Sequence, residues 1–335
     1  MSAMKTDLLL SVVIPVYNGV HTLEQCLQSV QKNSFKNFEL IIVDDGSSDG
    51  SRQIAAKYTN NIFLHEKNQG LVCARMTGIA TARGEIVVNI DADVVIFQDT
   101  LGRIADFFEK NSDISAVTGR LSKKHPHSSF FSQYKNLYMN YIFGKLPNHV
   151  NFLYGSIHAL KKDAVEIYQS DQNIGEDSER GQRLISMGKK IAFLKDLEVV
   201  HLKKYSFMSW VKNDFRVPYH WATIFIRFKG WKSLGKNKTG YLHSPKEQLA
   251  SVVIGPLSAL LFALSMLGLI PIGAPIALLA VWGLLNASFI AFLWKEKGAW
   301  FGLRAVLATY FDHLVMATGI FFGLLNACYK KGDAA

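Results

Sequence analysis

The stretch GEIVVNIDADVVIF, residues 84–97, is a short apolar run that two carboxylates interrupt. Residues 86–90 are mostly apolar, as expected for a strand buried on both faces of a parallel sheet. Asp91 and Asp93 follow, one residue apart, and apolar residues resume at Val94. The pattern therefore places two acidic side chains where a buried strand ends.

The first 120 residues alternate between short apolar runs and helical stretches. We expect strands at 8–14, 38–44, 61–66 and 85–90, and helices at 20–32, 51–59 and 70–82. This alternation predicts an α/β fold, with a parallel sheet covered by helices on both faces. In such sheets, ligands bind beyond the carboxyl ends of the strands. The polar residues expected at these ends are Tyr17, Asp44, Asp45, Asp91 and Asp93.

The Asp91–Asp93 pair has a chemical interpretation. Carboxylate oxygens are hard ligands that suit Mg²⁺ or Mn²⁺. Mg²⁺ is often bound by one or two carboxylates, with phosphate and water completing its shell. The alternative is an ordinary surface loop, because two such aspartates occur often by chance. Their position after a buried strand favours a metal–diphosphate site.

The stretch IIVDDGSSDGS, 41–51, allows two interpretations that can both hold. In the structural one it is a polar turn whose Ser47, Ser48 or Asp49 caps the next helix. In the functional one, Asp44 or Asp45 accepts hydrogen bonds from a ribose or a base.

The stretch NIGEDSERGQRLISMGKKI, 173–191, also has a structural and a functional interpretation. Glu176 and Asp177 stand at the start of a predicted helix, where acids complement the helix dipole. In the functional interpretation, one of the two acids is a general base.

Five motifs together resemble the family 2 glycosyltransferases with the GT-A fold, in order and spacing along most of residues 8–201. They are SVVIPVYNG (11–19), VDDGSSDGS (43–51), NQGLVCARMTGIATARGE (68–85), DAD (91–93) and GED (175–177). The resemblance implies inverting transfer of a sugar from a UDP-, GDP- or dTDP-sugar to an acceptor, with Mg²⁺ or Mn²⁺ as cofactor.

The resemblance also implies roles for individual residues. Asp177 corresponds to the catalytic base, and Glu176 stands beside it at the donor site. The resemblance implies nucleotide-sugar contacts for Pro15, Tyr17, Asp45 and Arg75, with Asp44 beside them. It implies metal and diphosphate contacts for Asp91 and Asp93. His201 stands where some members carry a further metal ligand. A strand-end histidine without such a role is the alternative.

The C-terminal part is apolar enough for a membrane. Residues 249–294 contain no Asp, Glu, Lys or Arg. About 20 apolar residues cross a bilayer, and we expect spans at 249–270, 275–294 and 303–328. Asp312 and His313 are costly in hydrocarbon, so we expect them to pair with another helix or with lipid headgroups. The expected domains are 1–204 (catalytic), 205–246 (membrane interface) and 247–335 (transmembrane).

The segment 205–246 is aromatic and basic, and residues 201–246 carry ten Lys or Arg and one acid, Asp214. Its place beside the first span favours anionic lipids over nucleic acid as the partner and puts the catalytic domain in the cytoplasm. We expect an interfacial helix, broken at Pro218, in which Arg216 could bind a phosphate. The alternative is a helix packed on the catalytic domain.

Two family patterns are absent. The QxxRW signature of processive synthases is missing, which argues against a polymerising enzyme. The DxDxQ pattern of dolichyl-phosphate mannose synthases is missing too, since Val95 follows DADV. We expect a multi-pass enzyme of a bacterial inner membrane that glycosylates a lipid or lipid-linked saccharide at the cytoplasmic leaflet. The alternatives are a polyprenyl-phosphate glycosyltransferase and a non-catalytic scaffold. The sugar and the base stay open, and so does the oligomeric state, where a monomer and an oligomer are both alternatives.

Overall fold

The computed structural model describes residues 8–167, 175–230 and 245–332. Two compact units divide the chain: Met1–Pro126 with Pro147–Lys203, and His127–Leu146 with Lys204–Ala335. Residues 127–146 therefore group with the C-terminal helices, although sequence on both sides belongs to the first unit. Part of the predicted interface segment, 231–244 with Lys232, Lys236 and Lys238, lies outside the described residues.

The first unit is an α/β fold, and the predicted fold class is confirmed. Its strands are β1 (Leu10–Val16), β2 (Phe38–Asp44), β3 (Ile62–Leu64), β4 (Ile86–Ile90), β5 (Val94–Ile96), β6 (Ala116–Leu121), β7 (His149–Val150), β8 (Ile157–Lys161) and β9 (Ile191–His201). Its helices are α1 (Leu23–Gln31), α2 (Ser51–Ala55), α3 (Leu71–Thr81), α4 (Thr100–Lys110), a 3₁₀ helix η1 (Lys162–Ile167) and α6 (Glu176–Ser186).

The sheet has the order β3-β2-β1-β4-β8-β6-β9-β5, with β7 also paired to β9. Strands β1 to β4 are parallel, as the alternation predicts. The sheet continues with antiparallel pairs, β8 against β4 and β5 against β9. In the register of β1 and β2, Val16 lies opposite Asp44, so these two strands end together. This alignment brings the loops after them to one edge.

The core explains why the strand ends are held firmly. Helix α3 packs on the sheet, where Ala74 and Ile79 join a buried cluster with Val13 and Val43. The approach is close at Gly78, where a Cβ atom would collide with Val13. Because α3 packs tightly on the sheet, its side chains beyond the strand ends have a defined position.

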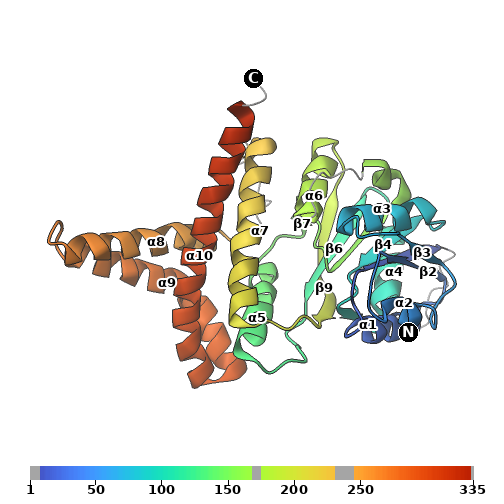
Figure 1. The fold of residues 1–335 in the computed structure, drawn as a ribbon, viewed down its shortest axis with the longest axis horizontal. Helices are drawn as coiled ribbons and strands as arrows, with labels where there is room; N and C mark the ends of the chain where they lie inside the picture. Colours follow the sequence, from blue (N-terminus) through green and yellow to red (C-terminus); the bar gives the residue numbers. More distant parts are fainter. Residues whose placement is uncertain (1–7, 168–174, 231–244, 333–335) are drawn as a thin grey trace. The chain divides into compact units, whose positions relative to one another are not determined.

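The second unit is helical. It consists of α5 (Phe130–Gly144), α7 (Phe207–Arg227), α8 (Lys246–Met266), α9 (Gly273–Lys297) and α10 (Ala299–Gly332). Among the described residues, three helices are long and apolar enough to cross a membrane: Lys246–Met266, Gly273–Lys297 and Ala299–Tyr329. Helices α8 and α9 form a hairpin, and α7 lies beside α10 (Figure 1).

The predicted break at Pro218 is wrong, because α7 runs unbroken through this residue. Proline removes one backbone donor from a helix, which tertiary packing can offset. Here α7 packs against α10 at Gly319 and Gly323, where added Cβ atoms would collide with the carbonyls of Phe215 and Tyr219. This close helix contact supports α7 on both sides of the proline.

Asp312 and His313 are fully buried and pair with other helices, one of the two outcomes expected for them. The Trp282 indole donates to Nδ1 of His313 at 2.9 Å, and the Gln248 amide lies 2.6 Å from Nε2. The Tyr134 hydroxyl donates to Asp312 at 3.4 Å. Polar groups of α5, α8, α9 and α10 therefore contact one another within the unit.

Candidate active site

Three of the parallel strands deliver the predicted site residues to one edge of the sheet. Pro15 is buried within β1, and Tyr17, which follows that strand, is 52% exposed. Asp44 ends β2, and Asp91 follows β4. The carboxyl ends of parallel strands meet at one edge, so the sequence prediction of a shared location agrees with the sheet topology.

Asp45 is buried and its carboxylate is fully engaged by the protein. It accepts hydrogen bonds from the backbone N–H groups of Gln69 (2.9 Å) and Gly70 (2.8 Å), and Nδ1 of His65 lies 2.6 Å from it. Nε2 of the same histidine contacts the Thr77 hydroxyl at 2.9 Å. Asp45 therefore fixes the loop before α3 in place, and its predicted nucleotide contact stays a prediction.

The loop 43–51 is braced by its own side chains. Asp44 accepts a hydrogen bond from the Ser47 amide at 2.9 Å. Asp49 accepts from the amides of Val20 (3.0 Å) and Ser51 (2.9 Å). The N-cap position of α2 is Gly50, which has no side chain to cap the helix. Of the three predicted capping residues, Asp49 nevertheless accepts from the amide of Ser51, the first residue of the helix. These polar groups also connect the loops that follow β1 and β2.

Arg75 lies at the centre of the site. It projects from α3, is 1% exposed, and donates to Asp91 at 2.5 Å and to the Gly155 carbonyl at 3.1 Å. Its guanidinium also forms an ion pair with Glu176. One buried cation thus links β4 and α6 with the loop before β8, and its geometry suits a residue that positions acids.

Glu176 and Asp177 are neighbours with different environments. Glu176 is 2% exposed and forms ion pairs with Arg75 and with Arg180, the latter at 2.8 Å. Asp177 is partly exposed and accepts hydrogen bonds from the amides of Ser178 (2.8 Å) and Gly155 (3.0 Å). Helix α6 begins here, after Gly175 in a left-handed conformation (φ 77°). Asp177 is the member of the pair that solvent can reach.

Asp93 and His201 form a carboxylate–imidazole pair at the site. Nε2 of His201 lies 3.3 Å from Asp93, with the side chains 13% and 31% exposed. Burial alone would raise the pKa of Asp93, but His201 and Lys203 outweigh it and the pKa lies below its usual value. Burial raises the pKa of Asp91, although Arg75 opposes this.

The donor set suits a divalent cation only in part. Across residues 8–167, 175–230 and 245–332, no three His, Cys, Asp or Glu side chains gather into a metal-binding group. Asp93 and His201 supply a carboxylate and an imidazole that are open to solvent. This two-ligand set fits an ion that takes its remaining ligands from a diphosphate and water. Asp91 is held by Arg75, so its metal contact stays a prediction.

Two residues of the site carry no recognisable sequence signal, and one predicted residue lies elsewhere. Gly155 hydrogen-bonds to Asp177 and Arg75, and a Cβ atom added there would lie 3.7 Å from the Asp91 carboxylate. Arg180, one turn further along α6, donates a 2.8 Å hydrogen bond to Glu176. Arg216 belongs to α7 of the second unit, and its phosphate contact stays a prediction.

The sheet, with acids at its carboxyl edge, defines a GT-A type α/β protein. Residues 11–168 match the family model described as glycosyl transferase family 2. The chain thus carries a family 2 glycosyltransferase domain, as the motifs indicated.

Curated relatives agree with this assignment. The chain is 30% identical over 203 residues to the minor teichoic acid biosynthesis protein GgaB of Bacillus subtilis (56% of this chain, 22% of the relative). It is 34% identical over 136 residues to a glycosyltransferase of Rickettsia felis (38% and 23%). The matched stretch thus spans less than a quarter of either relative.

Solved structures share the fold. The mannosyltransferase PcManGT of Pyrobaculum calidifontis, in complex with GDP-Man and Mn²⁺, aligns with a TM-score of 0.56 at 17% identity, covering 96% of this chain and 87% of the other. TarS 1–349 of S. aureus, in complex with UDP-GlcNAc, aligns with a TM-score of 0.50 at 18% identity (96% and 92%).

Proposed function

We propose that the protein is an inverting, metal-dependent glycosyltransferase that moves a sugar from a nucleotide-sugar to a hydroxyl of a lipid or lipid-linked saccharide. The observation that carries the proposal is the environment of Asp177. This carboxylate is partly exposed, oriented by the Gly155 amide, and adjacent to the Arg75–Asp91 pair. A base at the edge of the sheet, beside an acidic donor site, is what transfer to a hydroxyl requires.

The chemistry follows from these groups. Asp177 removes the proton from the acceptor hydroxyl, whose oxygen attacks the anomeric carbon. The bond to the nucleoside diphosphate breaks on the opposite face, so the anomeric centre inverts. Mg²⁺ or Mn²⁺ at Asp93 and His201 would supply Lewis-acid stabilisation of the diphosphate. Arg75 keeps Asp91 and Glu176 in position throughout.

The lipid acceptor is inferred from the second unit. Three of its helices are long and apolar enough to cross a membrane, and the first of them follows a basic segment. A catalytic unit attached to such helices works beside a lipid surface, and the basic segment favours the cytoplasmic leaflet. The named function of GgaB in teichoic acid biosynthesis is compatible with an envelope acceptor.

A donor screen tests this function. Membranes containing the full chain receive UDP-, GDP- and dTDP-sugars with Mn²⁺, and the extracted lipids are analysed by mass spectrometry. We expect one donor to add one sugar mass to a lipid, and Asp177→Asn membranes to lack the product. Fragmentation separates a sugar on a saccharide from one on a polyprenyl phosphate. If every donor yields only free sugar or no product, the function is wrong.

The membrane orientation is tested separately. With three spans and a cytoplasmic catalytic unit, a protease site appended after α10 should be cut only from the non-cytoplasmic side of sealed vesicles. Cleavage from the cytoplasmic side alone would mean that one of the three helices does not cross.

A further inference from the structure

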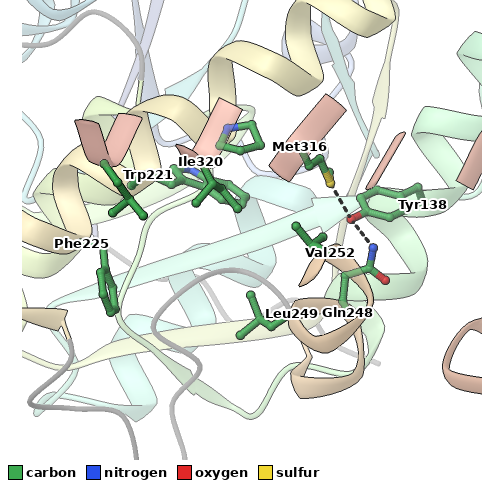
Figure 2. A pocket seen from close by; sticks show the side chains of 11 residues that line it. Tyr138, Trp221, Phe225, Gln248, Leu249, Val252, Met316 and Ile320 are labelled. Atoms are coloured by element: carbon green, nitrogen blue, oxygen red, sulfur yellow. Dashed lines mark hydrogen bonds between the residues drawn. The ribbon is translucent and has the colours of Figure 1, made fainter. Parts of the chain in front are cut away.

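An apolar groove lies within the second unit, between α7, α8 and α10. Its volume is about 190 Å³. Figure 2 shows side chains of these helices, with Tyr138 of α5, around one space. The walls that matter here are Trp221 and Phe225 on α7, Val252 on α8, and Ile320 and Leu324 on α10.

The walls are held by close helix packing. Met316, Ile320 and Leu324 follow at intervals of four residues and so form one stripe along α10. Beside this stripe, Gly319 and Gly323 hold α7 and α10 in backbone contact. This contact fixes the spacing of the two helices along one side of the groove.

The polar groups of the lining are already engaged. The Gln248 amide lies 2.9 Å from the Tyr138 hydroxyl and 2.6 Å from Nε2 of His313. The Tyr138 hydroxyl also donates to Met316 Sδ at 3.9 Å. A water molecule needs two to four polar partners to occupy a cavity, and engaged groups are poor ones. The groove therefore favours an apolar occupant.

The surroundings identify that occupant. Helices α8 and α10 are two of the three that are long and apolar enough to cross a membrane. The outer side of α8 exposes apolar side chains, with Val253 66% and Leu260 57% exposed. A bilayer that these helices cross would surround the groove with hydrocarbon. An engineered apolar cavity of about 150 Å³ binds benzene, so this volume accepts a segment of one hydrocarbon chain and not a whole lipid.

We propose that the groove binds the hydrocarbon chain of the lipid that accepts the sugar. This inference rests on the proposed function. A chain held between α7, α8 and α10 fixes its lipid on the same polypeptide that carries the catalytic unit. Affinity for the acceptor lipid then depends on contacts between its methylene groups and the groove. Binding and reaction of the nucleotide-sugar depend on the first unit.

Paired variants test the groove. Leu324→Trp fills it, whereas Leu325→Trp places the same side chain at a position that is 51% exposed on the same helix. Val252→Phe and Val253→Phe form a second pair on α8, in case the first variant does not fold. The full chain is reconstituted in phosphatidylethanolamine vesicles that contain phosphatidylglycerol with a diazirine in its acyl chain. Mass spectrometry locates the cross-links.

We expect cross-links at groove residues of the wild type, and their loss in Leu324→Trp but not in Leu325→Trp. With lipid extract as acceptor, the groove-filling variants should raise the acceptor KM about tenfold, because excluding two methylene groups costs about that factor. Their kcat and donor KM should stay at the wild-type values.

Wild-type cross-links only at exposed positions would overturn chain binding. A normal acceptor KM in a groove-filled variant that has lost its cross-links would show a structural lipid and overturn the acceptor role. Failure of the proposed function is distinguishable, because the wild type would then transfer no sugar to any lipid, whatever its cross-links.

Discussion

The backbone N–H of Gly155 donates a 3.0 Å hydrogen bond to the carboxylate of Asp177, and the two residues come from different parts of the first unit. The Gly155 carbonyl accepts a 3.1 Å hydrogen bond from Arg75. The backbone of Gly155 thus positions both the carboxylate of the proposed base, Asp177, and the guanidinium of Arg75, which binds Asp91. Small changes at Gly155 should affect chemistry before they affect stability.

Asp177→Asn should lower sugar transfer by about 10²–10⁴-fold, because removal of a general base slows the chemical step by that range. Donor affinity and melting temperature should stay near wild type. Single-turnover transfer and calorimetric titration of the nucleotide measure these quantities. Asp196→Asn, at a side chain 77% exposed, is the control. Retention of more than about a tenth of the wild-type rate would show that Asp177 is not the base.

Glu176→Gln should behave in the opposite way and reduce stability first. The variant leaves two buried guanidinium groups, Arg75 and Arg180, without their shared carboxylate. Removing one partner of a buried pair costs about 3–5 kcal/mol. Chemical denaturation of the full chain in detergent measures the loss. Glu198→Gln, which breaks a partly exposed pair with Arg120, should cost under about 1 kcal/mol. Equal losses in both variants would contradict the buried clamp.

Gly155→Ala should reduce transfer by roughly tenfold or more while the fold survives. Its Cβ atom would lie 3.3 Å from the Asp177 carboxylate, which must then shift by a few tenths of an ångström. Misplacement of about 1 Å can cost about 10²-fold, so a smaller shift should cost less than that. The melting temperature reports the fold. Gly283→Ala, where a Cβ atom meets nothing within 4 Å, controls for the exchange itself. Unchanged turnover would mean that Asp177 is not positioned by this contact.

Asp93→Asn should abolish the Mn²⁺-dependent part of nucleotide binding. The reason is that the variant removes the carboxylate of the Asp93–His201 pair. Calorimetry with a nucleoside diphosphate, with and without Mn²⁺, checks this. Asp113→Asn, at a side chain 63% exposed, should bind as the wild type does. The metal assignment fails if Mn²⁺ still strengthens nucleotide binding in Asp93→Asn.

His158 should make the first unit sensitive to acid. Burial, with Arg180 and Arg75 nearby, lowers the pKa of this imidazole well below 6.5. Below about pH 6.5 the His158 imidazole therefore binds a proton in the unfolded chain but not in the folded chain. The free energy of unfolding falls as the pH falls. The loss is at most about 1.4 kcal/mol per pH unit, the limit for one proton.

Denaturation between pH 7 and 5 measures this slope. His158→Asn keeps a donor near the position of Nδ1, which contacts the Tyr154 carbonyl at 3.0 Å, and it should flatten the slope. His149→Asn, at an exposed position, should leave the slope unchanged. Identical slopes in the wild type and His158→Asn would remove His158 as the cause.

The amino-acid sequence by itself determined where the strands end and which acids follow them. Asp44 closes one apolar run and Asp91 follows another. Both positions were predictable because a buried strand appears in the sequence as a short run of neighbouring apolar residues. The apolar C-terminal helices were predictable for the same reason, since a bilayer demands a long uninterrupted stretch. Each of these features depends on local pattern alone.

Only the tertiary structure decided which of these side chains meet. Glu176 and Asp177 look alike in the sequence, but the path of the chain brings Arg75 to one and Gly155 to the other. The groove beside Gly323 likewise needs three helices from separate parts of the chain. Contacts between distant residues depend on how whole elements pack, and a local pattern of hydrophobicity and charge carries no information about that packing.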